Sequence, residues 1–400
     1  MTYDCVVVGG GPAGATAATE LANAGATVLL LDRGGRIKPC GGAIPPRLIA
    51  DFAIPDTLIV GRAVSARMIA PSHAAVDMPV DRGGEGFVGM VDREHFDEWL
   101  RARAAAAGAE RRTGSFERIE RDADGGAVVV WTDARGGAER RVATLCVIGA
   151  DGARSRVAQD ALPGAEPMKC VFAYHEVIRS PAAEGNDRAG GFDRGRCDVF
   201  YQGALSPDFY AWVFPHGDTA SVGVGSANKG FPLRDAVARL RHQVGLDSCE
   251  TIRREGAPIP LKPLKRWDNG RDVLVTGDAA GVVAPASGEG IYYAMTAGRD
   301  AAAAVGAFLK SGDPKALRQA RRTFLRAHGR VFWILGIMQH FWYSNDRRRE
   351  RFVTMCEDRD VQNLIWPAYM TKRLVYARPL AYLRIFMKDL RHLWQTASWT

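Results

Sequence analysis

Three glycines near the start of the chain have the spacing of a phosphate-binding turn. Gly9, Gly11 and Gly14 form a G-x-G-x-x-G motif directly after the apolar, strand-like run at 3–8. In such a turn the first glycine permits a tight bend and the second lets the backbone approach a pyrophosphate, while the third lets the next helix pack closely on the strand. The motif therefore predicts a dinucleotide site.

The residues after the glycines complete this nucleotide-binding unit. A helix is expected over 12–24, which places Pro12 and Ala13 at the positively polarised N-terminus where phosphates bind. A second apolar strand then ends in Asp32, which Arg33 follows. A carboxylate at this strand tip accepts hydrogen bonds from ribose hydroxyls and repels a 2′-phosphate, so the pocket is predicted to prefer FAD or NAD to NADP.

Two later segments decide between these dinucleotides. A buried strand at 145–149 leads to Asp151 in the stretch GADGARS, and another strand at 273–276 leads to Gly277 and Asp278. The glycine-rich start of the next helix contains Pro285, Gly288, Gly290 and Ile291. A carboxylate for sugar-like hydroxyls beside a helix N-terminus suits a ribityl chain and an electron-rich ring. Because NAD has neither group, the sequence predicts FAD.

Two other motifs indicate a reaction pocket. Cys40 stands in a Lys-Pro-Cys-Gly-Gly loop in which Gly41 and Gly42 allow movement. By residue type alone, Cys40 is either a small buried hydrophobe or an active-site thiol. The second motif alternates aromatic residues along one face of a predicted strand, at Tyr210, Trp212 and Phe214. These aromatic side chains form either core or the wall of a pocket.

Together, the glycine motif, GADGARS and the GDAAGxxxPxxGEGI segment resemble the FAD-binding motifs of the flavoprotein hydroxylase superfamily. The resemblance implies an α/β fold in which a Rossmann-like FAD-binding domain is interleaved with an antiparallel-sheet substrate domain. A helical C-terminal region is expected to follow. Asp32 stands where many relatives have glutamate, a change that keeps the ribose contact chemically intact.

Within this superfamily the chain resembles the geranylgeranyl reductases along essentially its whole length, most closely those of chlorophyll and bacteriochlorophyll biosynthesis. The similar stretches are KPCGGAIPPR at 38–47, FVGMVDREHFDEWLR at 87–101, the Y-x-W-x-F-P pattern at 210–215 and G-x-G at 223–225. The loop and the aromatic strand are specific for prenyl reductases, whereas the FAD motifs are specific only for the superfamily.

The resemblance assigns roles to individual residues. It implies that Cys40, Gly41 and Gly42 are catalytic and lie near the flavin and a prenyl chain, without deciding whether the thiol donates a proton or shapes the pocket. It implies that Arg93 contacts FAD, against the alternative of an exposed arginine in a first helical turn. The aromatic strand is expected to wall a pocket for a C20 isoprenoid.

The expected reaction is reduction of isolated C=C bonds of a geranylgeranyl chain to phytyl, with FAD bound and NADPH as reductant. The expected substrate is geranylgeranyl diphosphate or a geranylgeranylated tetrapyrrole. Three alternatives remain: an FAD-dependent monooxygenase acting on a hydrophobic substrate, a membrane-surface flavoprotein electron carrier, and a non-redox FAD-dependent cyclase. The cysteine spacing speaks against the carrier, which would need an iron–sulfur site.

These motifs divide the chain into interleaved regions. The FAD-binding domain is expected at 1–50, 85–165 and 268–310, the substrate domain at 51–84 and 166–267, and the helical basic and aromatic region at 311–400.

The C-terminal quarter carries the positive charge of the chain. Residues 310–400 contain 18 Lys and Arg against 7 Asp and Glu, a charge of +11, whereas the whole chain carries +8 and the first 309 residues therefore −3. The same stretch holds Trp333, Trp342, Trp366, Trp394 and Trp399. This region is predicted to contact a membrane peripherally, to cap the fold with buried aromatics, or to offer a basic surface to a partner.

Composition excludes several other classes. With 47% hydrophobic and 24% charged residues, the chain is globular rather than disordered. Seven scattered cysteines predict a reduced, cytoplasmic protein with no metal centre. No leader is expected, because the chain starts directly in a strand-like run. The basic, aromatic C-terminal quarter predicts a peripheral position on the inner or photosynthetic membrane. No hydrolase elbow or nucleic-acid-binding module is present, so neither function is expected. Ordinary core or surface histidines are expected at His95, His175 and His216.

Overall fold

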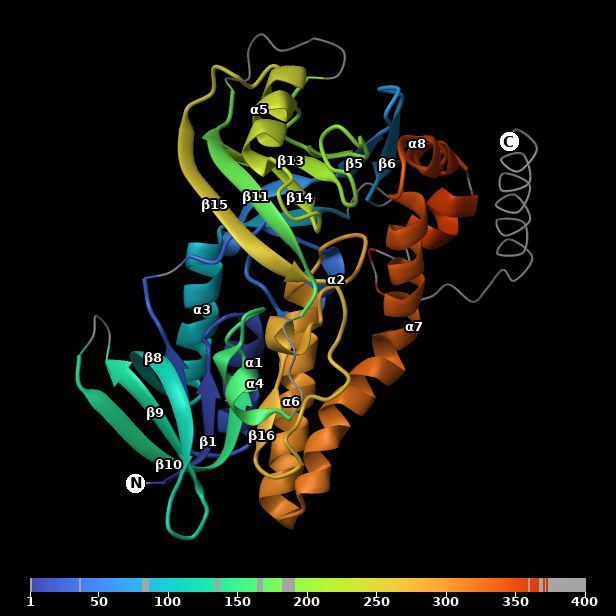
Figure 1. The fold of residues 1–400 in the computed structure, drawn as a ribbon. Helices are drawn as coiled ribbons and strands as arrows, with labels where there is room; N and C mark the ends of the chain where they lie inside the picture. The colour runs from blue at the N-terminus through green and yellow to red at the C-terminus, as the bar shows by residue number, and fades with distance from the viewer. Residues whose placement is uncertain are drawn as a thin grey trace.

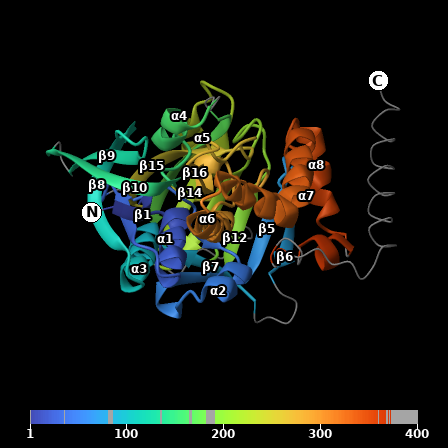
Figure 2. The same cartoon turned by 90° about the horizontal axis from the view of Figure 1, so that it is seen from below.

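A computed structural model of the chain describes residues 2–35, 37–80, 86–133, 137–163, 168–181, 191–358, 360–366, 370 and 372. Two main sheet layers lie one above the other, and the C-terminal helices run along one side of the molecule (Figure 1). Seen from below, these helices lie opposite the strands β8 to β10 (Figure 2). The arrangement agrees with the predicted α/β fold.

The lower layer is a dinucleotide-binding sheet. Its parallel strands lie in the order β8, β2, β1, β10 and β16, which is 3-2-1-4-5 in chain order. The bounds are β1 Thr2–Val8, β2 Val28–Asp32, β8 Glu110–Arg121, β10 Glu139–Gly149 and β16 Val273–Val275. An antiparallel strand, β9 (Ala127–Asp133), joins the long β8 to β10. The carboxyl ends of the parallel strands meet at one edge, which brings the predicted FAD motifs together.

Four helices belong to this layer. They are α1 Pro12–Asn23, α3 Arg93–Ala106, α4 Arg156–Ala161 and α6 Ile291–Ser311. Alanine and glycine allow α1 to pack against both β1 and α6: a Cβ at Gly14 would overlap the carbonyl oxygen of Gly9, and one at Gly298 would overlap that of Ala13. Because Gly14 and Gly298 have no side chain, α1 can lie directly against β1 and α6.

The upper layer is a seven-stranded sheet in the order β15-β11-β14-β13-β12-β5-β6. The bounds are β5 Ser65–Ile69, β6 Ala75–Pro79, β11 Cys170–Arg179, β12 Arg196–Phe200, β13 Ala211–His216, β14 Thr219–Ser226 and β15 Thr251–Pro260. Its pairs are antiparallel except for β12 with β5. The helix α5 (Leu233–Gln243) packs on β14 and β11. The predicted antiparallel sheet is thus present, with one parallel pair.

A small third sheet joins the two layers. Its strands lie in the order β3-β7-β4, with bounds β3 Ala43–Ile44, β7 Val88–Val91 and β4 Ile59–Ala63. The helix α2 (Pro46–Phe52) and a turn at Asp56–Leu58 connect β3 to β4. Since β7 and β4 pair with each other, the predicted FAD-domain range 85–165 and substrate-domain range 51–84 share one sheet.

The C-terminal region is helical as far as the structure describes it. It contains a turn at Pro314–Leu317, α7 Arg318–Trp342, α8 Asp346–Met355 and a π-helical turn at Val361–Ile365. Trp342 and Trp366 are buried, whereas Trp333 is 69% exposed. Trp394 and Trp399 lie outside the described residues. Among the helices described, none has the length and apolar character needed to cross a membrane.

Candidate active site

The glycine turn has the geometry that a pyrophosphate requires. Gly9 adopts φ +106°, a left-handed conformation that favours glycine. No protein atom lies within 4 Å of the position that a Cβ at Gly11 would take. This open space adjoins the N-terminus of α1, which has no side-chain cap. The turn therefore fits the phosphates of a dinucleotide.

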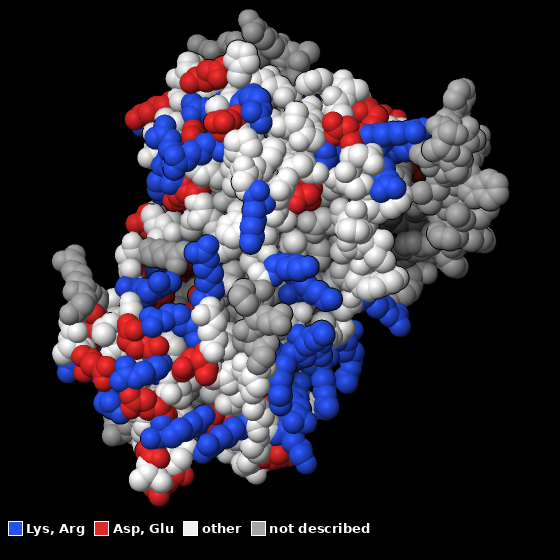
Figure 3. Space-filling view, in the orientation of Figure 1, with Lys and Arg blue, Asp and Glu red and all other residues white. Residues whose placement is uncertain are grey.

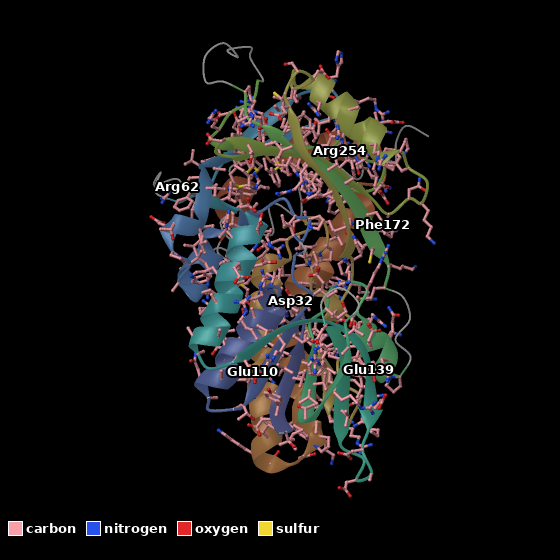
Figure 4. The ribbon with its side chains drawn as sticks, turned by 90° about the vertical axis from the view of Figure 1, so that its left-hand side faces the viewer. Asp32, Arg62, Glu110, Glu139, Phe172 and Arg254 are labelled. Carbon is pink, nitrogen blue, oxygen red and sulfur yellow. The ribbon has the colours of Figure 1, made fainter. Side chains whose placement is uncertain are left out.

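Asp32 lies beside this turn at the carboxyl end of β2. Its Oδ1 accepts a hydrogen bond from the Gly10 N–H at 3.1 Å, and its Oδ2 lies 3.4 Å from the guanidinium of Arg101 in α3. Figure 4 shows Asp32 at the level where the lower layer meets the sheet that carries Phe172 and Arg254. The sequence did not single out Arg101, whose role depends on the packing of α3 beside β2.

A largely apolar cavity of about 370 Å³ is lined by both main layers and by the C-terminal helices. Such a lining suits a hydrophobic ligand with a few polar groups to orient it. The predicted site residues that line the cavity are Pro12, Cys40, Gly41, Gly42, Arg93, Tyr210, Trp212, Phe214, Asp278, Gly288, Gly290 and Ile291. Five separate chain segments therefore contribute to one site.

The nucleotide-binding wall of the cavity carries a charged pair. Asp278 lies in a short turn at Gly277–Ala280 and forms an ion pair with Lys38. Close by, α6 begins with Gly290 as its N-cap and has no side-chain cap of its own. Its unpaired N–H groups and the Asp278 carboxylate fit the ring and ribityl chain of FAD. Lys38 would hold the carboxylate in place.

Cys40 lies in the same cavity, next to a buried arginine. Its Sγ accepts a hydrogen bond from the Gly42 N–H at 3.4 Å and also contacts the Arg93 side chain. Arg93 is only 5% exposed and forms a bidentate pair with Asp97 at 2.8 Å. Burial acts to lower the Arg93 pKa, but the Asp97 carboxylate and the Cys40 contact raise it overall. The alternative of an exposed first-turn arginine is therefore wrong.

The two glycines after Cys40 allow its loop to lie directly on the aromatic strand. A Cβ at Gly41 would stand 3.1 Å from the Phe214 ring. Gly42 adopts φ +69°, and a Cβ there would come within 2.5 Å of both His216 Nε2 and the Val91 carbonyl oxygen. Burial lowers the pKa of His216 to about 4, so this ring is neutral at physiological pH. His216 thus packs directly against the loop that carries Cys40.

The predicted aromatic residues form a continuous wall. Neighbouring rings stand 5.9 Å apart from Tyr210 to Trp212 and 6.1 Å apart from Trp212 to Phe214. The Tyr210 hydroxyl donates a hydrogen bond to the Ser287 carbonyl oxygen, and this bond connects the aromatic wall to the loop before α6. Burial raises the Tyr210 pKa, so the residue stays protonated.

His175 also lines the cavity, where the sequence predicted only an ordinary histidine. Trp212 Nε1 donates to Ser221 Oγ at 3.1 Å, and Ser221 Oγ lies 3.0 Å from His175 Nδ1. The other ring nitrogen of His175, Nε2, lies 3.2 Å from a Glu255 carboxylate oxygen. A Cβ at Gly223 would overlap the Trp212 ring and the Cβ of His175. The G-x-G motif therefore leaves space for the side chains of Trp212 and His175.

The C-terminal helices supply a wall that the sequence analysis missed. Their cavity-lining residues are Leu335, Met338, Tyr343, Phe352, Met355, Cys356, Val361, Trp366 and Met370. The helical spacing of Leu335 and Met338 was a usable signal of a buried face. Which element covers that face is a matter of tertiary packing.

Several predicted cofactor residues lie outside the cavity. Asp151 accepts hydrogen bonds from the Ser155 hydroxyl and from the backbone N–H groups of Arg156 and Val157, so it caps α4. Burial raises the pKa of this carboxyl. Ala13 and Gly277 pack against each other, Arg33 is exposed, and Pro285 lines a separate cleft.

The fold and the site together define a flavin-dependent oxidoreductase with a Rossmann-like FAD-binding layer. The model of the pyridine nucleotide-disulphide oxidoreductase family matches residues 3–183. A geranylgeranyl bacteriochlorophyll reductase-like protein from Thermoplasma acidophilum has a TM-score of 0.79 at 21% identity, covering 98% of this chain and 99% of that one. A flavin-dependent brominase has a TM-score of 0.75 at 16% identity, with coverage of 98% and 100%. These likenesses show the fold.

Sequence comparison identifies the family. The chain is 56% identical to the geranylgeranyl diphosphate reductase of Rhodobacter capsulatus over 98% of each chain. It is 36% identical to the chloroplastic enzyme of that name from Oryza sativa, over 97% of this chain and 85% of the other. It is 35% identical to the one from Synechocystis over 98% of each. The chain belongs to the geranylgeranyl diphosphate reductase family.

Gly11→Val is expected to abolish FAD binding while the protein still folds. The space at Gly11 is empty of protein atoms, so the valine meets only the pyrophosphate. Bound FAD after gel filtration, together with the far-ultraviolet circular dichroism spectrum, measures both effects. Gly306→Val is the matched control, because its Cβ also meets no protein atom within 4 Å. FAD at wild-type occupancy in Gly11→Val would contradict the assignment.

Proposed function

We propose that this protein reduces isolated C=C bonds of a geranylgeranyl chain to phytyl, using bound FAD and NADPH as reductant. The observation that carries the proposal is the apolar cavity, which has the FAD cradle as one wall and an aromatic strand as another. The relatives named geranylgeranyl diphosphate reductase support the same activity. The chain to be reduced is carried by a diphosphate or by a tetrapyrrole.

Each reduction adds one hydride and one proton to a C=C bond and oxidises one NADPH to NADP⁺. FAD, when bound and reduced, would supply the hydride. An isolated alkene is a poor hydride acceptor, so the protein contributes by placing it closely and by excluding water. Tyr210, Trp212 and Phe214 hold the chain, and Cys40, beside Arg93, either donates the proton or sets the position of the reacting bond.

Anaerobic incubation with NADPH tests this function. Geranylgeranyl diphosphate and a geranylgeranylated pigment are supplied in separate reactions, and mass spectrometry follows the products. Products heavier by about two, four or six mass units, one pair of hydrogens per bond, are expected from at least one substrate. Peroxide formation in air without alkene reduction in either reaction would instead identify a monooxygenase.

Cys40→Ala is expected to keep FAD and its reduction by NADPH but to slow chain reduction and to leave partly reduced products. The thiol contacts Gly42 and Arg93 on the cavity side, away from the adenine end of the cradle. Cys40→Ser, which keeps a hydrogen-bonding group, is the control and should act closer to wild type. Wild-type turnover and product distribution in Cys40→Ala would show that the thiol is structural.

We also propose that α7 places the protein peripherally on an anionic membrane, at the cytoplasmic face of the inner or photosynthetic membrane. One exposed stripe of the helix contains Arg318, Arg322, Arg326 and Arg330 and continues as Trp333, Ile334 and Ile337. Figure 3 shows the cluster of Lys and Arg over the lower half of α7. Basic residues followed by exposed apolar ones suit docking at a headgroup layer.

The later basic run at 347–349 does not form part of this stripe. Arg349 is buried and donates to Asp346 and to the carbonyl oxygens of Pro207 and Tyr343. Its removal would disturb folding, so a test of membrane contact has to use α7 itself.

Trp333→Ser/Ile337→Ser is expected to weaken binding to anionic vesicles by about tenfold or more, because each buried apolar side chain contributes about 1.5–3 kcal/mol. Added salt should also weaken vesicle binding by the wild-type protein, since charges are screened beyond about 8 Å at physiological ionic strength. Vesicle co-sedimentation measures both effects. Ile252→Ser is the matched control, because Ile252 on β15 is 45% exposed and Ile337 is 49% exposed. Equal binding by all three proteins would refute contact through α7.

A further inference from the structure

A second, open cleft of about 990 Å³ lies next to the FAD-binding segments. Its walls come from the loop at 261–266, the two residues before β11, and the end of α7. The charged or titratable residues that line it are Lys169, Lys262, Lys265, Arg266, Asp208 and His340. Four of these six are permanently cationic at neutral pH.

The four cations have no carboxylate partner within the described part of the chain. No ion pair involves Lys169, Lys262, Lys265 or Arg266, and all four side chains are exposed. Asp208, whose oxygens accept from the Ser226 hydroxyl at 2.7 Å and the Ala227 N–H at 2.9 Å, offsets only one of the four positive charges. The cleft therefore has a net positive charge available to a ligand.

The loop that carries three of these cations is fixed by its backbone. The Leu261 N–H donates to the Lys169 carbonyl oxygen at 3.1 Å, and the Leu264 N–H donates to that of Ala280 at 2.9 Å. Arg321 of α7 donates to the Leu264 carbonyl oxygen at 3.1 Å. The loop is thus tied to the flavin segment and to α7. Because none of these bonds uses Lys262 or Lys265, their side chains remain free to bind.

A single loop separates this cleft from the reaction cavity. Pro285 lines the cleft, whereas Ala286 lines the cavity, and Tyr343 lines both. Ala286 adopts φ +64°, which strains a residue other than glycine. Two bonds to the end of α7 and its C-cap hold it there: its N–H donates to Gln339 Oε1, and its carbonyl oxygen accepts from the hydroxyl of the C-cap Tyr343, both at 3.1 Å. A ligand in the cleft would lie one loop away from the flavin.

We propose that this cleft binds the phosphate groups of a small organic ligand of the reaction, through Lys169, Lys262, Lys265 and Arg266. The inference rests on the proposed function, which involves two phosphate-bearing molecules: the nicotinamide dinucleotide and a prenyl diphosphate. Phosphate oxygens form strong charge-assisted hydrogen bonds with ammonium and guanidinium groups. The volume of the cleft lies at the upper end of the range for small-molecule sites.

Equilibrium binding to the FAD-loaded protein tests the cleft without turnover. NADP⁺ and inorganic diphosphate are titrated in separate arms by calorimetry, at low and at physiological ionic strength. Lys262→Gln/Lys265→Gln is expected to bind at least one probe about tenfold or more weakly, since two charged hydrogen-bond donors are lost. Lys310→Gln/Lys315→Gln removes the same charge from two exposed lysines outside the cleft and should bind as wild type does. Unchanged unfolding midpoints would show that both variants are intact.

The two arms distinguish the sources of the phosphate. Weaker binding of NADP⁺ alone assigns the cleft to the reductant, weaker binding of diphosphate alone assigns it to the substrate headgroup, and loss of both shows one site for either. Wild-type affinity for both probes in the cleft variant, equal loss in the control, or no binding by the wild type would overturn the proposal. Chain reduction that persists after such a failure would leave the proposed function standing. Binding of a probe in the cleft without any chain reduction would support the phosphate site and contradict the proposed function.

Discussion

Contact of backbone on backbone at glycines is the constraint on which the rest of the structure depends. Gly14 lies against the Gly9 carbonyl group, and Gly298 lies against that of Ala13. Because no side chain separates β1, α1 and α6, the pyrophosphate turn and the start of α6 are held in one rigid unit. A single added carbon at either glycine would move α1 and separate the two halves of the FAD cradle.

The same principle operates in the upper sheet at Gly223. Its missing side chain lets Trp212 and His175 lie over β14, where Ser221 Oγ accepts from Trp212 Nε1 and Glu255 lies 3.2 Å from His175 Nε2. Burial acts to raise the pKa of Glu255, but the hydrogen bond to His175 and the charge of Arg253 lower it overall. The carboxylate is therefore ionised and paired beneath an otherwise apolar cavity, so the wall stays ordered without presenting an unpaired charge to a hydrophobic chain.

The helix α7 connects three surfaces that a motif search treats separately. Leu335 and Met338 close the cavity, while Trp333 and Ile337 lie on the exposed side of the same turns. Gln339 and Tyr343 hold the loop of Ala286 between the cavity and the basic cleft. A shift of this helix would change all three surfaces together, since one rigid element carries them.

The sequence by itself determined those parts of the protein whose geometry is local. The turn at Gly9 and the loop at Gly41 and Gly42 depend on spacing within a few residues, and the motifs around Asp278 indicated FAD because they follow a strand and open a helix. The aromatic strand also showed its shared face through simple alternation. Family resemblance added the prenyl chain as the ligand of that face.

Only the tertiary structure decided which distant residues meet. The pairing of Lys38 with Asp278, the contact of Arg93 with Cys40, and the place of His175 in the cavity wall arise between elements far apart in the chain. The tertiary structure also shows that the Asp151 carboxylate, a predicted cofactor ligand, accepts hydrogen bonds from the first turn of α4. The physical reason is that a motif fixes its own backbone, whereas the partner of a side chain depends on which strands and helices pack beside it.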